Sequence, residues 1–136
     1  MEIRRTTEAF LETLKETYFS NAANEATEFL RGECRLLSYL NIDEDKSFKP
    51  SELSKQLNIT TPRTASLIKT LEKKGYITRQ RSNKDKREAY IKITESGIKY
   101  IEDKREKTCC LFDRAFIKLN ETERCEFIRI LSKLSH

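Results

Sequence analysis

Apolar residues recur every three or four positions along most of the chain, which is the spacing of one face of an α-helix. This spacing predicts a first helix from Arg4 to about Ala23. The apolar side of that helix consists of Phe10, Leu11, Leu14 and Tyr18. Asn24 is a suitable cap for a second helix, which ends before the polar run "NIDEDKSFK". Gly32 inside the second helix costs on the order of 1 kcal/mol relative to alanine, which weakens its continuity.

Two shorter helices are predicted next, and Pro50 occupies the first position of the earlier one, where its missing N–H is tolerated. Asn58 follows that helix and tolerates the left-handed conformation of a tight turn. Thr60 or Thr61 caps the later helix, which ends at Gly75. The buried side of the later helix is predicted to be Thr64, Leu67, Ile68 and Leu71. Two short helices joined in this way form a helix-turn-helix.

The period of the pattern then changes to two, as expected for strands. One predicted strand, "YITRQR", places Ile77, Arg79 and Arg81 on one face, and the other, "AYIKIT", does the same with Ile91 and Ile93. The two strands form a hairpin whose tip contains no glycine. The tip is the charged cluster Lys84, Asp85, Lys86, Arg87 and Glu88.

Two more helices complete the chain. Thr94 caps a long helix that reaches about Leu119, and Asn120 with Glu123 resembles a capping box for the last helix. The predicted fold is therefore mainly α with a small β-hairpin. A chain of 136 residues suits a single domain. Its expected parts are N-terminal helices in 1–41, a helix-turn-helix lobe with the hairpin in 48–94, and the long and last helices in 94–136.

Positive charge is concentrated in one quarter of the chain. The segment from Thr60 to Ile93 has ten Lys and Arg against three Asp and Glu, whereas the rest has 17 against 19. A concentrated basic segment on a near-neutral body favours a polyanionic partner. A solvated basic face that binds nothing has the same composition, so charge alone leaves both interpretations open.

Several classes of site lack the residues that they need. The four cysteines show no Cys-x-x-Cys spacing and the one histidine is His136, so we expect neither a metal site nor a cofactor. No phosphate-cradling glycine loop and no nucleophile beside a base is present, so an enzyme is not predicted. The first residues lack an apolar signal core and no run reaches transmembrane length, which predicts a cytoplasmic protein with reduced thiols.

The cysteines suit packing better than sensing of redox state. Cys34, Cys109 and Cys125 fall on apolar helix faces, so we expect them in the core. Cys110 follows Cys109 directly, and a bond between the sulfur atoms of adjacent helical residues would be strained. The alternative of a redox-sensing role for any of the four stays open.

Three stretches between Ser51 and Gly97 resemble the MarR family of winged-helix transcriptional regulators. The stretch "SELSKQLNIT" is similar to the first helix of the family's helix-turn-helix, and "RTASLIKTLEKKGYITR" to its recognition helix and first wing strand. The stretch "DKREAYIKITESG" matches the Asp-x-Arg wing and the Ile-Thr-x-x-Gly start of the next helix. The resemblance implies a dimeric repressor of transcription that binds a palindromic operator in double-stranded DNA. Asn58 departs from the family, which often has glycine there.

The resemblance also implies which side chains contact DNA. The outward face of the recognition helix, opposite its apolar side, consists of Pro62, Arg63, Ser66, Lys69, Thr70 and Lys73. We expect base contacts in the major groove from Arg63 and Ser66. Phosphate contacts are expected from Thr60, Thr61, Lys69 and Lys73. The wing residues expected at DNA are Arg79, Arg81, Lys84, Asp85, Lys86 and Arg87. Among these, Arg87 would enter the minor groove and Asp85 would hold the wing conformation.

The terminal helices carry more apolar surface than a small winged-helix lobe can bury, which predicts a homodimer. The expected interface residues are Phe10, Leu14, Phe112, Phe116, Ile128, Leu131 and Leu134.

A family effector cleft would lie between the second helix, the long helix and the lobe, where Tyr39, Phe48 and Tyr100 either reach a small molecule or pack as core. The alternative function is a winged-helix protein-interaction module without DNA binding, which has no use for ten cations on the helix and wing.

Overall fold

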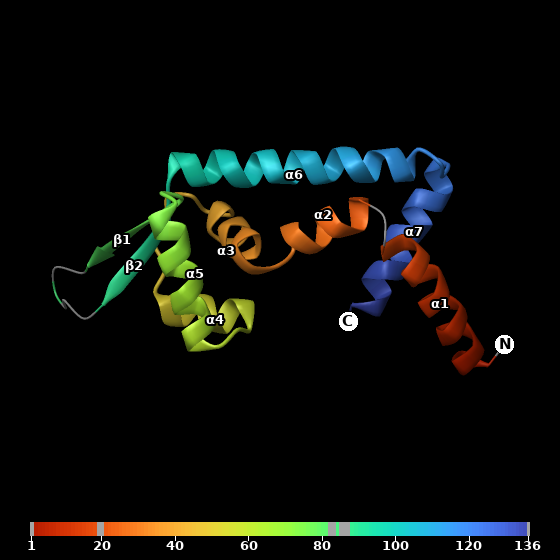
Figure 1. The fold of residues 1–136 in the computed structure, drawn as a ribbon, viewed down its shortest axis with the longest axis horizontal. Helices are drawn as coiled ribbons and strands as arrows, with labels where there is room; N and C mark the ends of the chain where they lie inside the picture. The colour runs from red at the N-terminus through yellow and green to blue at the C-terminus, as the bar shows by residue number, and fades with distance from the viewer. Residues whose placement is uncertain (1, 19–20, 82–83, 85–87, 136) are drawn as a thin grey trace. The chain divides into compact units, whose positions relative to one another are not determined.

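The structure is a computed structural model that describes residues 2–18, 21–81, 84 and 88–135 (Figure 1). The elements in chain order are α1 (Ile3–Tyr18), α2 (Asn21–Phe29), α3 (Gly32–Asn41), α4 (Pro50–Leu57), α5 (Thr61–Lys73), β1 (Ile77–Arg81), β2 (Ala89–Ile93), α6 (Glu95–Phe116) and α7 (Glu121–Leu134). The predicted class, mainly helical with one hairpin, is confirmed. The chain forms two compact units, one of 1–24 with 106–136 and one of 25–105.

The N-terminal segment differs from the two helices predicted there. The first helix ends at Tyr18, a new helix already begins at Asn21, and Asn24 therefore lies inside a helix instead of capping one. The predicted second helix is also divided, because Arg31 is extended and Gly32 has a φ of 53°. Glycine adopts this left-handed conformation without steric cost, so the chain turns at Gly32 and starts α3 there.

The unit of residues 25–105, which we call the winged lobe, contains the hydrophobic core. Helix α3 contributes one whole side to it, and α4, α5 and both strands cover that side. The side of α5 predicted to be buried is confirmed, because Thr64, Leu67, Ile68 and Leu71 are all inaccessible to solvent. Its opposite side is therefore held at the surface by the packing of this core.

A tight turn connects α4 to α5. Asn58 adopts the left-handed conformation with a φ of 52°, as predicted, and Thr60 caps α5 by accepting a hydrogen bond from the backbone N–H of Arg63. The hydroxyl of Ser54 donates to the hydroxyl of Thr64 over 2.7 Å, and Thr64 donates to the carbonyl of Thr60 over 3.1 Å. This chain of hydrogen bonds joins the two helices of the helix-turn-helix inside the lobe.

The hairpin pairs β1 and β2 antiparallel, with Ile77 opposite Ile93 and Arg81 opposite Ala89. Phe48, which precedes α4, exchanges backbone hydrogen bonds with Ile91 over 2.9 and 2.7 Å. The base of the hairpin is therefore attached to the segment that leads into the helix-turn-helix.

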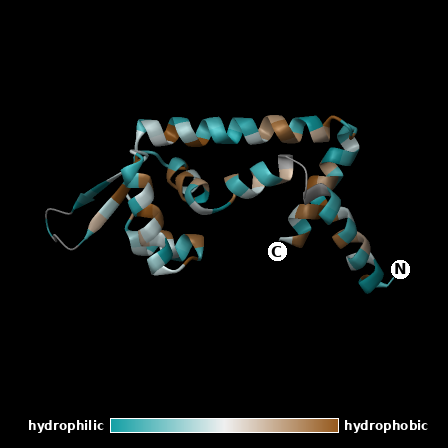
Figure 2. Ribbon diagram, in the orientation of Figure 1, coloured by the Kyte–Doolittle hydropathy of each residue, from teal (hydrophilic) through white to brown (hydrophobic). Residues whose placement is uncertain are grey.

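The other unit consists of α1, the end of α6 and α7, and most of its apolar side chains are accessible. Helix α7 has no buried residue, although brown, hydrophobic residues recur along it in Figure 2. The ring of Phe116 contacts those of Phe112 and Phe127, with centroid distances of 6.0 and 5.7 Å. Cys109 and Cys125 are exposed, so their predicted core position is wrong in this chain, because the helix faces that carry them have no covering layer. Cys34, in the winged lobe, is buried as predicted.

Candidate nucleic-acid interface

Helix α5 presents a polar and cationic face to solvent, opposite its buried side. The exposed side chains predicted to contact DNA are Thr60, Thr61, Pro62, Arg63, Ser66, Lys69 and Lys73. Thr70 is half-buried, and its hydroxyl donates to the carbonyl of Ser66. Among the residues that the structure describes, Lys69 and Lys73 have no carboxylate partner. The structure thus gathers these eight residues on one accessible surface.

The side chain of Arg63 lies back toward the start of α3. A Cβ atom placed on Gly32 would be 3.6 Å from a guanidinium nitrogen of Arg63. This is an ordinary van der Waals distance, so the guanidinium lies against the beginning of α3. Because the group makes no ion pair with any residue that the structure describes, it can turn outward without breaking one of these.

The C-terminal end of α5 is attached to α3 by an ion pair. Lys74 donates to the carboxylate of Glu33 over 2.8 Å, and this hydrogen bond raises the pKa of Lys74 above its usual value. Since both side chains are partly solvated, the pair contributes little to stability. Its larger effect is on geometry, because it joins α3 to the end of the helix that carries the polar face.

Only part of the predicted wing surface lies within the described residues. Arg79 forms an ion pair with Glu72 of α5 over 3.5 Å, which holds its guanidinium beside the end of that helix. Arg81 and Lys84 are exposed. Three predicted residues, Asp85, Lys86 and Arg87, lie outside the described residues.

A cluster that the sequence analysis missed connects the hairpin to α4. The carboxylate of Glu88 accepts a hydrogen bond from Lys49 on one oxygen and from the hydroxyl of Tyr90 on the other, each over 3.2 Å. Glu88 raises the pKa of Lys49, through this hydrogen bond and through its charge. Lys49 and Glu88 are 39 positions apart, so no periodicity in the sequence could indicate this contact.

The winged lobe also contains a cavity of about 400 Å³ between α2, α3 and α6. Its lining is Phe29, Ser38, Asn41, Ile42, Ile101, Glu102 and Arg105. The hydroxyl oxygen of Ser38 is buried and has no hydrogen-bond partner among the described residues. Sequence analysis did not identify this lining, although a serine among the leucines of α3 was a usable signal.

The aromatic residues considered for an effector cleft pack elsewhere in the lobe. The rings of Tyr39 and Phe48 lie 5.3 Å apart, and Tyr76 stacks on Tyr100 with centroids 4.5 Å apart. None of the three residues considered, Tyr39, Phe48 and Tyr100, lines the cavity. Their role in the structure is packing, which was one of the two alternatives for them.

The thiol of Cys34 lies beside Tyr100 and Lys104, and burial raises its pKa above the usual value. Lys104 is itself paired with Glu28 over 2.6 Å. Since a thiolate is the reactive form of cysteine, this environment keeps Cys34 unreactive. The structure therefore favours packing over sensing for this residue.

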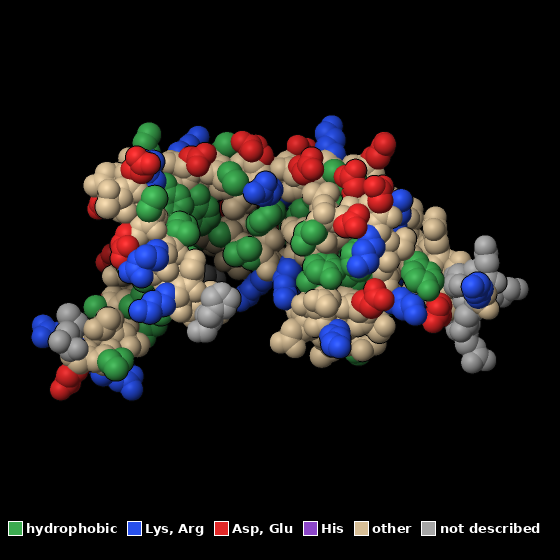
Figure 3. Space-filling view, turned by 180° about the vertical axis from the view of Figure 1, so that it is seen from behind, with side chains coloured by type: hydrophobic (Ala, Val, Ile, Leu, Met, Phe, Trp, Pro, Cys, Tyr) green, Lys and Arg blue, Asp and Glu red, His purple; other side chains and the backbone are tan. Residues whose placement is uncertain are grey.

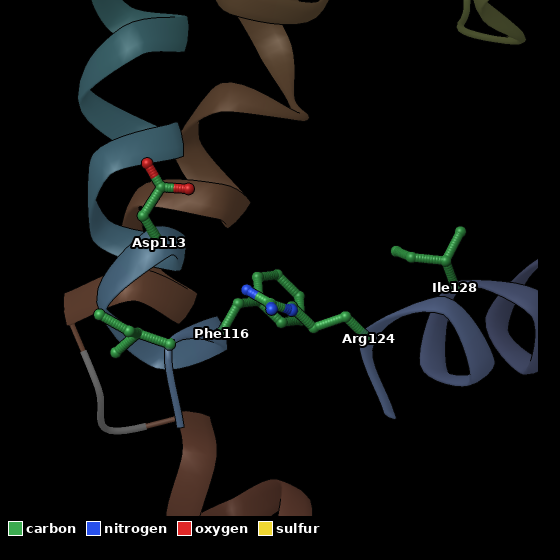
Figure 4. Close-up of a pocket in the computed structure, with 5 residues that line it drawn as sticks. Asp113, Phe116, Arg124 and Ile128 are labelled. Atoms are coloured by element: carbon green, nitrogen blue, oxygen red, sulfur yellow. The ribbon is translucent and has the colours of Figure 1, made fainter. Parts of the chain in front are cut away.

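The terminal unit has a groove of about 450 Å³ between the end of α6 and the start of α7. Asp113 and Phe116 line it from α6, Ile117 from the turn that follows, and Arg124 and Ile128 from α7. Figure 4 shows the side chain of Arg124 extending toward the ring of Phe116. Other exposed apolar side chains of this unit come from α1 and α7, and Figure 3 shows green side chains at the surface among charged ones.

The described ranges contain neither a metal-binding cluster nor a membrane-spanning helix. No group of three or more His, Cys, Asp or Glu side chains there is arranged to hold a metal ion. No helix there has the length and apolar character needed to cross a membrane.

Comparison with known protein families identifies similar sequences over this region. A family model described as "MarR family" matches residues 36–89. The HTH-type transcriptional regulator YpoP of Bacillus subtilis is 30% identical over 139 residues, which cover 98% of this chain and 97% of YpoP. A second regulator from that organism, YwhA, is 31% identical over 84 residues, and the match spans 62% of this chain and 60% of YwhA.

Solved structures share the fold along almost the whole chain. The YusO protein of Bacillus subtilis superimposes with a TM-score of 0.77 at 18% identity, covering 99% of this chain and 98% of YusO. A MepR mutant of Staphylococcus aureus bound to an oligodeoxyribonucleotide has a TM-score of 0.66 at 22% identity, with 94% of each chain covered. At these identities the likeness concerns the fold.

Proposed function

Because the chain belongs to the MarR family of transcriptional regulators, we propose that it is a sequence-specific repressor that binds double-stranded DNA in the cytoplasm as a homodimer. The family consists of DNA-binding regulators and not of enzymes. One observation carries the proposal, namely that the face of α5 opposite the core is exposed and bears Arg63, Lys69 and Lys73. The MepR mutant, which has the same fold, was solved with DNA bound.

Helix α5 is proposed to lie in the major groove, where each base pair presents a distinct set of donors and acceptors. Arg63 and Ser66, in the first two turns, would contact base edges. The phosphate contacts would come from Thr60, Thr61, Lys69 and Lys73, with Pro62 and Thr70 at the same surface. Thr60 already accepts the capping hydrogen bond, but its hydroxyl proton is available to a phosphate oxygen.

The hairpin is proposed to follow the DNA backbone into the adjacent minor groove. Arg79, Arg81 and Lys84 supply positive charge on it, and the resemblance adds Lys86, Arg87 and the conformational role of Asp85. A narrow minor groove concentrates negative potential and attracts arginine. Base identity is poorly distinguished there, so the hairpin would add affinity more than sequence preference.

The homodimer is proposed to form through the terminal unit, with the predicted residues Phe10, Leu14, Phe112, Phe116, Ile128, Leu131 and Leu134 at its centre. Five of these side chains are exposed and the two phenylalanines of α6 are half-buried. Two-fold symmetry would place two α5 helices in successive major grooves, about one helical turn apart on a palindromic operator. Repression would follow from occupation of that site.

The cavity of the winged lobe is proposed to hold a small-molecule effector. Its apolar side chains are Phe29, Ile42 and Ile101, whereas Ser38 and Asn41 offer hydrogen-bonding groups. A volume of about 400 Å³ suits a small ligand with an apolar body and a polar end. Because α3 is also paired to α5 through Glu33 and Lys74, a ligand that shifts α3 would change the position of the DNA-binding helix.

Selection of bound sequences from random duplex DNA tests the proposal. We expect an inverted repeat to be recovered, with affinity that falls steeply as salt rises. Arg63→Ala should relax preference at one position in each half-site by about 1–3 kcal/mol, whereas Arg87→Ala should weaken binding to all sites and lower the salt slope. No binding at low salt would instead support a winged-helix protein-interaction module.

A further inference from the structure

We propose that Glu88 is a positioning residue that holds the hairpin at a fixed angle to the helix-turn-helix, by joining Lys49 to Tyr90. We call these three residues the wing clasp. The inference rests on the proposed contact between the hairpin and DNA, and it adds a residue that contributes to binding without touching the DNA.

The wing clasp holds the hairpin at a second point, farther from its base. The backbone bridge between Phe48 and Ile91 holds the hairpin near its base. Glu88 lies three residues closer to the tip than Ile91, just before the start of β2. Since Lys49 precedes α4 directly, its bond to Glu88 connects this outer part of the hairpin to the first helix of the helix-turn-helix.

All three members of the clasp are restrained from more than one side. Both oxygens of the Glu88 carboxylate are used, one by Lys49 and the other by the hydroxyl of Tyr90. The backbone N–H of Lys49 donates to Glu52 over 3.2 Å, so the residue is held by main chain and side chain. The ammonium group of Lys49 also lies 5.9 Å from the centre of the Tyr90 ring. The side chains of Lys49 and Glu88 remain 39% and 41% exposed, and these contacts favour one direction of the carboxylate.

Because Glu88 is negatively charged, a positioning role and simple electrostatics predict opposite effects of neutralising it. It is one of only three acidic residues between Thr60 and Ile93, the basic quarter of the chain. A carboxylate near DNA weakens binding through repulsion of phosphates, so long-range electrostatics alone predicts tighter binding when it is neutralised. A positioning role predicts the opposite sign, because loss of the clasp frees the hairpin.

The experiment measures the affinity of the full-length protein for the palindromic duplex recovered by selection. We expect Glu88→Gln, which keeps the shape and removes the charge, to weaken binding about fivefold. Tyr90→Phe changes no charge and should weaken it by about twofold. Asp45→Asn, in the exposed loop after α3, is the matched control for loss of one carboxylate from the lobe and should bind at least as tightly as the parent.

A shorter duplex separates positioning from a general defect of folding. It retains the major-groove half-sites and lacks the flanking base pairs that the hairpins would cover. The parent should bind it more weakly than the long duplex, and Glu88→Gln should bind it as the parent does. Lys49→Met and the double variant Glu88→Gln with Lys49→Met complete a double-mutant cycle. On the long duplex, the double variant should bind about as weakly as either single variant.

The possible results distinguish failure of the proposed DNA binding from failure of the positioning role of Glu88. A parent protein that binds neither duplex would disprove the proposed function itself. A parent that binds both duplexes equally would overturn the positioning role, since the hairpin would then contribute nothing. Glu88→Gln binding the long duplex as tightly as the parent or more tightly would also overturn it, as would equal weakening on both duplexes.

Discussion

Gly97 lies where helix α6 passes too close to the main chain for any side chain. A Cβ atom there would be 2.2 Å from the carbonyl oxygen of Tyr76. Thr94 holds this approach in place, because its hydroxyl donates to the carbonyl of Gly75 over 2.7 Å and accepts from the N–H of Gly97 over 3.1 Å. These contacts give the Ile-Thr-x-x-Gly motif a physical reason, since they attach the start of α6 to the segment after α5.

Gly97→Ala should lower the free energy of unfolding by about 1–3 kcal/mol, because the backbone of Tyr76 must shift to admit the methyl group. Urea denaturation followed by circular dichroism measures the change. Ser96→Ala, at the neighbouring exposed position in the same helix, is the control and should be nearly neutral. Equal stability of the Gly97 variant and the parent would contradict the close contact.

Cys34 should be the least reactive of the four thiols in the folded protein. Burial raises its pKa, so at pH 8 a smaller fraction is thiolate than for a free cysteine, and the rate should increase as pH rises toward the folded pKa. In a variant with Cys109, Cys110 and Cys125 changed to serine, we expect iodoacetamide to modify Cys34 only slowly until the chain is unfolded with urea. Rapid alkylation of the folded variant would contradict a packing role.

The joint between α4 and α5 depends on a pair of hydroxyl groups, of which Thr64 is buried and Ser54 is half-buried. Ser54 donates to Thr64, which is fully inaccessible to solvent. Thr64→Val keeps the volume and removes the partner of Ser54, and should cost about 1 kcal/mol of stability. The control is Thr70→Val, which removes a half-exposed hydroxyl from the same helix and should cost less, because water can replace that bond. Thermal denaturation of both variants measures the difference.

Elements with local signals were predicted well from the sequence. Helix α5 has a capping threonine, a four-residue apolar side and a terminal glycine, and the structure agrees at all three. The strands follow from a change of period, and the capping box of α7 is formed by Asn120 and Glu123 as expected. In each case the signal lies within one short segment of the sequence, even where the strands pair residues such as Ile77 and Ile93.

Elements that depend on distant contacts were predicted less well. The break before α3 was missed because a left-handed Gly32 and a helical glycine look alike in the pattern. The wing clasp joins residues far apart in sequence, and the cavity lining comes from three helices. Cys109 and Cys125 share apolar faces with their neighbours, but an apolar face is buried only if another layer covers it.

The two units of the molecule differ in how far they bury their apolar side chains. The winged lobe buries its leucines and isoleucines almost completely. In the terminal unit, α7 alone leaves five large apolar side chains about half or more exposed: Phe127, Ile128, Ile130, Leu131 and Leu134. Helix α1 adds Phe10, Leu11 and Leu14 to the same unit. An exposed surface of this kind typically marks a protein interface.

The proposed occupant of that surface is a second copy of the chain, and a stable dimer requires burial of roughly 1,200–2,000 Å² in total. Ile128→Asp combined with Leu131→Asp would place two carboxylates in the interface, where their desolvation has no compensating partner. We expect the parent to sediment as a dimer at micromolar concentration and the double variant as a monomer that remains folded. The control is Ile42→Asp, which changes an exposed isoleucine of the winged lobe and should leave the dimer intact. Because a monomer presents only one recognition helix, the double variant should also lose most of its preference for a palindrome over a single half-site. A parent that sediments as a monomer at this concentration would contradict the proposed dimer.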